Sequence, residues 1–116
     1  MKKTVKLPEN FFLGAAASAW QTEGWSEKKE SQDSYIDLWY KENKNVWHNG
    51  YGPAVATDYY HRYKEDIAYM KEIGMNCYRT SLNWSRFLTD YENIVVDEEY
   101  ANYYDKMLDE LIDLRR

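Results

Sequence analysis

Two successive strand–helix units are the feature that most constrains how this chain folds. A short apolar segment at residues 11–17 is followed, after a long polar and aromatic loop, by a helical pattern that starts near residue 57. A second strand-like segment at 75–84 precedes another helical pattern from residue 97. Alternating strands and helices indicate a parallel sheet with right-handed crossovers. The sequence therefore predicts an α/β fold, with the first strand covered on both faces.

Capping residues and apolar spacing define both helices. Thr57 is the expected N-cap of the first helix, which ends at Gly74, and Asp97 is the expected N-cap of the second. The apolar stripes have helical spacing and comprise Tyr60, Tyr63, Ile67 and Met70 in the first helix, and Tyr100, Tyr104, Met107, Leu108 and Leu111 in the second. The long loop between the first strand and the first helix contains one further predicted helix, at residues 34–42.

Two strands do not complete a sheet. Each keeps an open edge, so the missing partners must come from further chain or from another molecule. The second helix also stops without a Gly or Asn cap. We therefore expect residues 1–116 to be the N-terminal portion of a single larger domain, truncated at its C-terminal end. The open edges also predict self-association.

Composition excludes several classes of function. A formal charge of −5 and a pI near 5.0 argue against nucleic-acid binding, and the apolar residues are too interrupted for a membrane span. The single cysteine, Cys77, cannot form an internal disulfide, which fits a reducing compartment and predicts a cytoplasmic location. The N-terminal lysines before FFLGAAASAW resemble a secretory signal, but this run is short and alanine-rich, which favours a strand.

Polar and aromatic residues follow the predicted strands at their carboxyl ends, where ligands bind in parallel α/β folds. Amides and carboxylates can bind neighbouring hydroxyls, and indoles can cover the C–H face of a sugar. Packing at the core or rim is the competing interpretation of the tryptophans. The candidate residues are Trp20, Gln21, Glu23, Trp25, Asn83, Trp84 and Arg86.

Arg79 is expected to be largely desolvated, because alternation places it on the second strand. A buried guanidinium needs a partner, which leaves two interpretations open. It either forms an ion pair that holds the fold or orients an active-site carboxylate. His48 and His61 lack the spacing of metal ligands, so no metal site or cofactor is predicted. No catalytic acid–base pair can be chosen within this sequence.

Two motifs resemble the family 1 β-glycoside hydrolases. FFLGAAASAWQTEG is similar to the opening motif of these enzymes, and ATDYYHRYKEDIAYMKEIGMNCYRTSLNWSR resembles their first helix and second strand, in the same order. The resemblance implies the first two units of a (β/α)8 TIM barrel, incomplete in this chain. Asp58, His61, Arg62, Tyr63, Trp84 and Arg86 match blocks that we interpret as structural.

The resemblance also implies roles for three residues. Gln21 matches the glutamine that hydrogen-bonds sugar hydroxyls. Trp20, also expected to bind the substrate, is a modest departure, because it stands where an aromatic residue, often Tyr, is usual. Arg79 matches the arginine that contacts the nucleophilic glutamate, so it would support catalysis without taking part in it. Family members act by double displacement between two glutamates. Both glutamates would lie beyond Arg116, so no catalytic residue is expected in this chain, and the isolated chain is expected to be inactive.

The stretch QDSYIDLWYKENKNVWHNGYGPAVATDYY looks most like members that cleave 6-phospho-β-glucosides. The implied substrate is a β-glycoside, specifically a phosphorylated disaccharide, used in carbohydrate metabolism. One alternative is a non-catalytic interaction or self-assembly module derived from a glycosidase. Another is a different barrel enzyme that shares only the strand–helix order.

Overall fold

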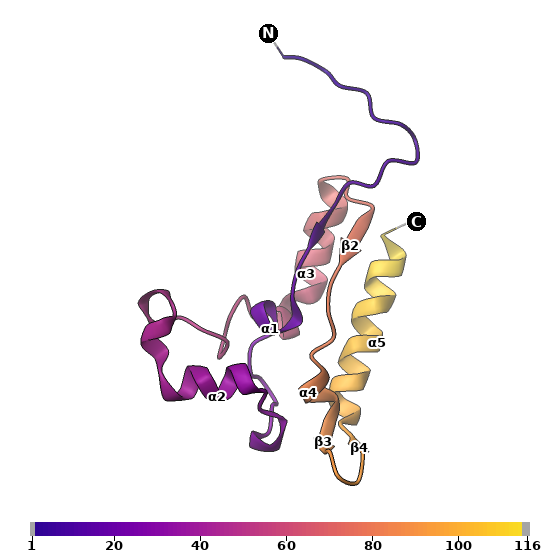
Figure 1. Cartoon of the computed structure of the whole chain (residues 1–116). Helices are drawn as coiled ribbons and strands as arrows, with labels where there is room; N and C mark the ends of the chain where they lie inside the picture. Colours follow the sequence, from indigo (N-terminus) through magenta and orange to yellow (C-terminus); the bar gives the residue numbers. More distant parts are fainter. Residues whose placement is uncertain (1, 115–116) are drawn as a thin grey trace.

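The computed structural model describes residues 2–114. The chain runs from an extended N-terminal segment through a short strand into a long excursion at residues 23–58, then through the first long helix, a second short strand and the last long helix (Figure 1). The helices and strands are, in order, β1 (Gly14–Ala16), α1 (Ala19–Thr22), α2 (Tyr35–Glu42), α3 (Tyr59–Glu72), β2 (Cys77–Arg79), α4 (Trp84–Phe87), β3 (Leu88–Asp90), β4 (Val95–Val96) and α5 (Glu98–Asp113). Three single-turn 3-10 helices lie in the excursion, at Glu30–Gln32, Lys44–Val46 and His48–Gly50.

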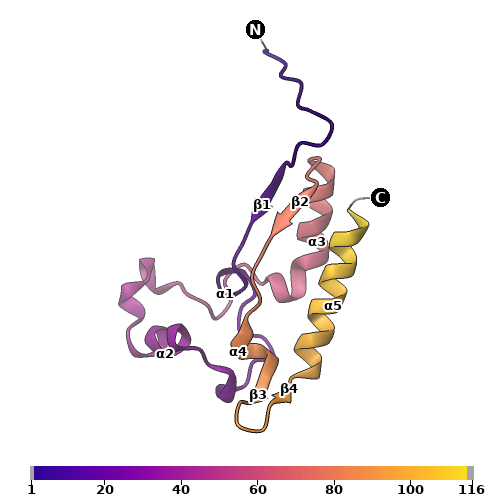
Figure 2. The same ribbon diagram turned by 45° about the vertical axis from the view of Figure 1, so that its right-hand side comes forward.

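The strands β1 and β2 pair in parallel, as the sequence predicts. Gly14 lies opposite Cys77, and Ala16 lies opposite Arg79. The backbones approach so closely that a Cβ on Gly14 would lie 1.8 Å from the Cys77 carbonyl oxygen, so only glycine fits there. Figure 2 shows the two strands side by side, with the excursion that carries α2 leaving from their carboxyl ends.

The core is formed by one face of each long helix. Its buried members are Tyr59, Tyr63 and Ile67 of α3 and Tyr100, Tyr103 and Met107 of α5. Tyr60, Met70, Tyr104 and Leu111 pack against this cluster, which confirms most of the predicted stripes. Leu108 is exposed and Tyr103 is buried in its place.

The predicted ends of α3 and α5 are largely correct. Asp97 is the N-cap of α5 and accepts hydrogen bonds from the backbone N–H groups of Glu99 and Tyr100, and Ser34 caps α2. The N-cap of α3 is Asp58, not Thr57 as predicted. Asp58 has a left-handed backbone, with φ of 53°, and its side chain does not cap the helix. Gly74 follows α3 with φ of 82°, as expected of the residue that ends a helix.

Both strands were predicted too long, and the prediction that β1 is covered on both faces is wrong. All three residues of β1 are exposed, as are Phe11 and Phe12 before it. The reason is that β1 pairs only with β2, and the helical core contacts the sheet mainly through Tyr78. Between β2 and α5 the chain forms α4 and the antiparallel β3–β4 hairpin, where no element was predicted.

The described part of the chain is open in shape. Its radius of gyration is 17.2 Å, whereas a compact domain of this length would have about 13 Å. The extended N-terminal segment and the α2 excursion project from the helical core (Figure 1). No helix among residues 2–114 has the length and apolar character that crossing a membrane requires.

A buried polar network joins the loop after α1 to α4 and α5. Arg86 is 1% exposed. Its guanidinium donates hydrogen bonds to the carbonyl oxygens of Gly24 and Ser26 and lies over the rings of Tyr60 and Tyr100. The side-chain amide of Gln32 donates to the Arg86 carbonyl oxygen at 2.7 Å and to the Asp97 carboxylate at 2.6 Å. Nearly every buried polar group of this network therefore has a partner.

Glu23 is the acidic member of this network. Its carboxylate is 2% exposed and accepts a hydrogen bond from the Tyr100 hydroxyl, which lies 2.9 Å from each oxygen. Burial raises the pKa of Glu23 to about 7, although the Tyr100 hydrogen bond and the positive charge of Arg86 both act in the opposite direction. Because the pKa in the folded chain is the higher one, folding favours the protonated form.

The stability of the chain should depend on pH through Glu23. Its stabilising contribution is complete below about pH 4.5, the usual pKa of the group, and is lost as the pH rises to about 7. Glu23→Gln keeps a neutral acceptor for Tyr100, so over this range the variant should gain about 3 kcal/mol relative to wild type. Urea unfolding at several pH values measures this difference. Glu72→Gln, on the exposed face of α3, is the control and should track wild type. A constant difference between Glu23→Gln and wild type would contradict the assignment.

Candidate sugar-binding site

The carboxyl ends of the two parallel strands are tied together. The backbone N–H of Ala17 donates to the Arg79 carbonyl oxygen at 2.8 Å, and that of Ala19 donates to the Ser81 hydroxyl at 3.0 Å. The helix α1, which carries Trp20 and Gln21, therefore starts at the point where both strands end. The structure thus places these two predicted residues at the expected edge of the sheet.

A pocket of about 230 Å³ opens beside α1. It is lined by Trp20, Gln21, Trp47, Tyr51, Gly52, Pro53 and Ala56. The side chain of Gln21 is exposed and forms no hydrogen bond with any other described residue, so its amide is free to bind a ligand. An amide among aromatic rings suits a sugar, because the amide binds hydroxyls while a ring covers the C–H face.

Trp47, which lines the pocket, belongs to a cluster of aromatic rings in the excursion. The ring of Trp47 lies 6.3 Å from that of Trp20, 5.0 Å from that of Trp39 and 5.3 Å from that of Tyr40, between centroids. Gly52 packs so closely on Tyr40 that a Cβ would lie 2.2 Å from its ring. These contacts hold the far part of the loop against α1.

Asp37 holds two tryptophans beside this cluster through hydrogen bonds. Its Oδ1 accepts hydrogen bonds from the indole N–H groups of Trp20, at 2.9 Å, and Trp25, at 2.8 Å. Its Oδ2 accepts from the backbone N–H and the hydroxyl of Ser34. Burial alone would raise the pKa of Asp37, but the hydrogen bonds from Ser34 and the two indoles together hold it below its usual value.

Arg79 is exposed, so the prediction that it is desolvated is wrong. It forms no ion pair with any residue in the described range, so no ion pair that holds the fold is seen here, and its contact with an active-site carboxylate stays a prediction. The physical reason is that Tyr78 faces the helical core, so alternation places Arg79 on the opposite face of β2, where its side chain is exposed. The buried arginine of the fold is Arg86, seven positions further along.

The other candidates lie outside the pocket. Glu23 and Arg86 belong to the buried network, and Trp84 is 65% exposed on α4. Trp25 packs edge-on against Tyr40, with 5.8 Å between ring centroids, which fits the packing interpretation of that tryptophan.

Sequence reasoning missed Trp47, Tyr51 and Asp37 as contributors to the site. Three tryptophans and a glycine-rich turn within one long loop were the available indication, since such loops are usually functional.

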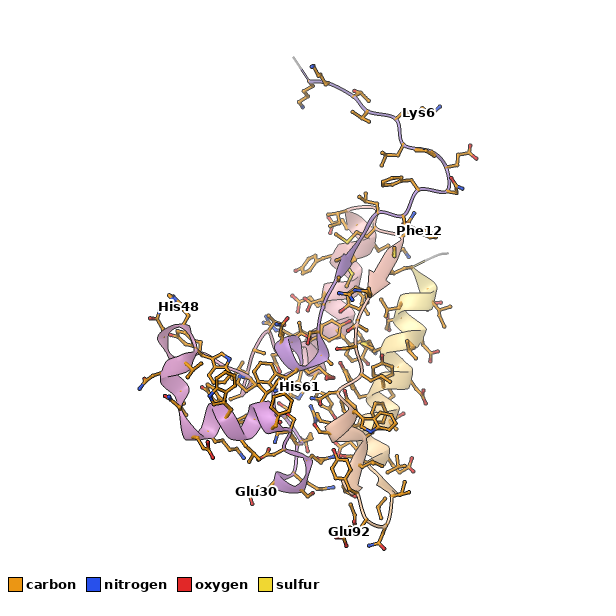
Figure 3. All side chains as sticks on the ribbon, in the orientation of Figure 1. Lys6, Phe12, Glu30, His48, His61 and Glu92 are labelled. Carbon is orange, nitrogen blue, oxygen red and sulfur yellow. The ribbon has the colours of Figure 1, made fainter. Side chains whose placement is uncertain are left out.

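Neither histidine takes part in a metal site within residues 2–114, where no three His, Cys, Asp or Glu side chains form a suitable group. His48 lies at the outer end of the excursion, apart from His61 (Figure 3). The Nδ1 of His61 lies 2.8 Å from an Asp58 carboxylate oxygen on the surface. The pair belongs to the entry into α3, as the structural interpretation of both residues predicts.

Comparison with known proteins identifies the family. The model of glycosyl hydrolase family 1 matches residues 3–115. The chain is 35% identical over 107 residues to the 6-phospho-beta-glucosidase GmuD of Bacillus subtilis (strain 168), covering 92% of the chain and 23% of that protein. It is 39% identical over 108 residues to beta-glucosidase 24 of Oryza sativa subsp. japonica, covering 92% of the chain and 21% of that protein.

Solved structures agree. The AHE enzyme from Alicyclobacillus herbarius superposes with a TM-score of 0.81 at 29% identity, covering 97% of this chain and 25% of that one. The psychrophilic beta-glucosidase BglU from Micrococcus antarcticus superposes with a TM-score of 0.79 at 32% identity, covering 93% of this chain and 22% of that one. The chain spans about a quarter or less of these relatives. Its fold is that of part of a TIM barrel, and the chain belongs to glycosyl hydrolase family 1.

Proposed function

We propose that residues 1–116 form the N-terminal portion of a TIM-barrel catalytic domain that hydrolyses β-glucosides with retention of configuration. The main observation in support is the free side-chain amide of Gln21, which lines a pocket with Trp20 and Trp47 near the carboxyl end of β1. This is where barrel enzymes bind their substrates. Gln21 would bind hydroxyls of the sugar, Trp20 would cover its apolar face, and Arg79 would contact a carboxylate supplied by the rest of the barrel.

The mechanism needs two glutamates whose carboxyl groups lie about 5 to 5.5 Å apart, one to attack the anomeric carbon and one to protonate the leaving oxygen. In our proposal both come from outside residues 1–116. What this chain contributes is substrate positioning, because it brings an amide and aromatic rings to the edge where the reaction would take place.

We further propose that the complete enzyme acts on 6-phospho-β-glucosides in the cytoplasm, as part of carbohydrate metabolism. Support for the phosphorylated substrate is the sequence of the long excursion, together with the likeness to a 6-phospho-beta-glucosidase. Support for the location is the single cysteine, Cys77, which is unpaired.

The DNA downstream of codon 116, read in all three frames, tests the catalytic proposal. We expect it to encode an Asn–Glu pair after a fourth strand and a second glutamate after a seventh. Absence of any such reading frame would contradict the proposal that this chain begins a hydrolase.

The purified chain should release no nitrophenol from 4-nitrophenyl β-glucoside or from its 6-phosphate. The physical reason is that Gln21 and Arg79 can position a sugar and a carboxylate but cannot supply nucleophile and acid. Absorbance assays of wild type against Gln21→Ala measure this. Release by wild type above the Gln21→Ala level would show that the chain has its own catalytic groups.

A second candidate function is self-assembly, and one observation favours it. A hollow of about 350 Å³ lies between β2 and α5 and is lined mainly by apolar side chains, among them Phe12, Leu108, Leu111 and Ile112. Phe12 is 71% exposed and Ile112 is 57% exposed. Exposed apolar surface beside an open strand edge promotes association.

Sedimentation velocity tests this second function. Association through the hollow should give dimers or larger species at micromolar concentration, and Ile112→Lys should shift the chain towards monomer. The control is Asp109→Lys, a charged change on an exposed position of the same helix, which should leave the distribution unchanged. A monomeric wild type at this concentration would exclude the assembly function.

A further inference from the structure

The two oxygens of the Asp37 carboxylate serve different partners. Oδ2 accepts from the backbone N–H and hydroxyl of Ser34, which completes the cap of α2. Oδ1 accepts from the indoles of Trp20 and Trp25, which lie 17 and 12 residues earlier in the chain. The cap needs only the first set of bonds. The second set therefore requires an explanation beyond the stability of α2.

Burial makes these indole bonds strong and selective. The side chain of Asp37 is 1% exposed, and a buried carboxylate is costly unless its hydrogen bonds are satisfied. Bonds to a charged acceptor are also stronger than bonds between neutral groups. An indole that turned away from Asp37 would leave part of this charge without a donor, so both rings are held in one orientation.

Trp20 depends on this contact because α1 offers it little support. The helix has only four residues, and its N-cap Ser18 makes no side-chain capping bond. The Trp20 ring nevertheless lines the pocket next to Gln21 and faces the ring of Trp47. The orientation of the Trp20 ring thus depends on Asp37, which lies in α2, 17 residues further along the chain.

We propose that Asp37 is a positioning residue for sugar binding: by holding the indole N–H of Trp20, it sets the ring face that the pocket presents beside Gln21. The inference rests on the proposed function, because it takes the ligand of this pocket to be a β-glucoside. The indole face would cover the C–H groups of the sugar while the Gln21 amide binds its hydroxyls. Both contacts form at once only if the ring is held at a defined angle to the amide.

Substitution of Asp37 in the 116-residue chain tests the role, with methyl β-D-glucoside as the probe. Binding is followed by the ¹⁵N–¹H resonances of the indole groups, which report Trp20 and Trp47 directly. Asp37→Leu keeps similar volume and removes the acceptor. It should weaken binding by about tenfold, as expected when one well-placed contact is lost. The Trp20 and Trp25 indole resonances should shift in this variant without ligand, while that of Trp84 should not.

Ser34→Ala is the matched control, because it removes the hydroxyl of the same cap and leaves both indole bonds in place. Its affinity for the probe should equal that of wild type. Asp37→Asn is the second variant, since one amide oxygen cannot serve both the indoles and Ser34. It should weaken binding about threefold, which keeps the test valid if the Leu variant fails to fold.

The outcomes separate the two proposals. Unchanged affinity in Asp37→Leu, or in Asp37→Asn with a shifted Trp20 indole resonance, overturns the positioning role, and binding by wild type then leaves the proposed function standing. Equal losses in Ser34→Ala and the Asp37 variants also overturn it, because Asp37 would then act only as a cap. If the wild-type resonances do not move with the probe, the pocket does not bind the sugar, and the assignment of this site and the role of Asp37 both fall.

Discussion

The buried guanidinium of Arg86 is the interaction on which the rest of the structure depends. It follows β2 closely, yet it binds two carbonyl oxygens of the loop after α1 and lies against rings from both α3 and α5. Its own carbonyl oxygen is held by Gln32. One residue therefore joins the loop after β1, both long helices and the segment after β2. The parallel sheet of the described residues has two strands, and these contacts join the elements around it.

The site uses this frame without sharing its residues. Arg86 and Glu23 hold the loop immediately after α1, so Gln21 and Trp20 leave the sheet edge in a defined direction. Asp37 and the aromatic cluster then hold the distant part of the excursion against α1, through the contacts of Asp37 and Trp47 with Trp20. Two separate sets of contacts thus hold the pocket in shape. One is the buried polar network of Arg86 and Glu23, and the other is Asp37 with the aromatic cluster of the excursion. This division explains why the long excursion, which has little regular structure, still forms a defined wall.

The prediction of the helices from the sequence was accurate, because their signals are local. The tyrosines of α3 and α5 repeat at helical spacing, Asp97 caps its helix, and Ser34 caps α2. The predictions that the first strand is covered on both faces and that Arg79 is desolvated were wrong. Alternation within a strand predicts which residues share a face, but not whether another element covers that face. Arg79 and Arg86 lie seven residues apart, and only packing against the loop and the tyrosine rings distinguishes the buried one. Gln21 and Trp20 were found through their position after β1, whereas Trp47 and Asp37 approach them only through contacts distant in sequence.

The sequence by itself determined the strand–helix order, the parallel pairing, the starts of the three longer helices to within about one residue and, through its two motifs, the family. These properties follow from short-range spacing, capping and residue identity. Only the tertiary structure decided which arginine is buried, which tryptophans form the pocket and what holds them there. The reason is physical: the hydrogen bonds of Arg86 and Asp37 join residues up to 62 positions apart, and no local pattern in the chain specifies partners at that distance.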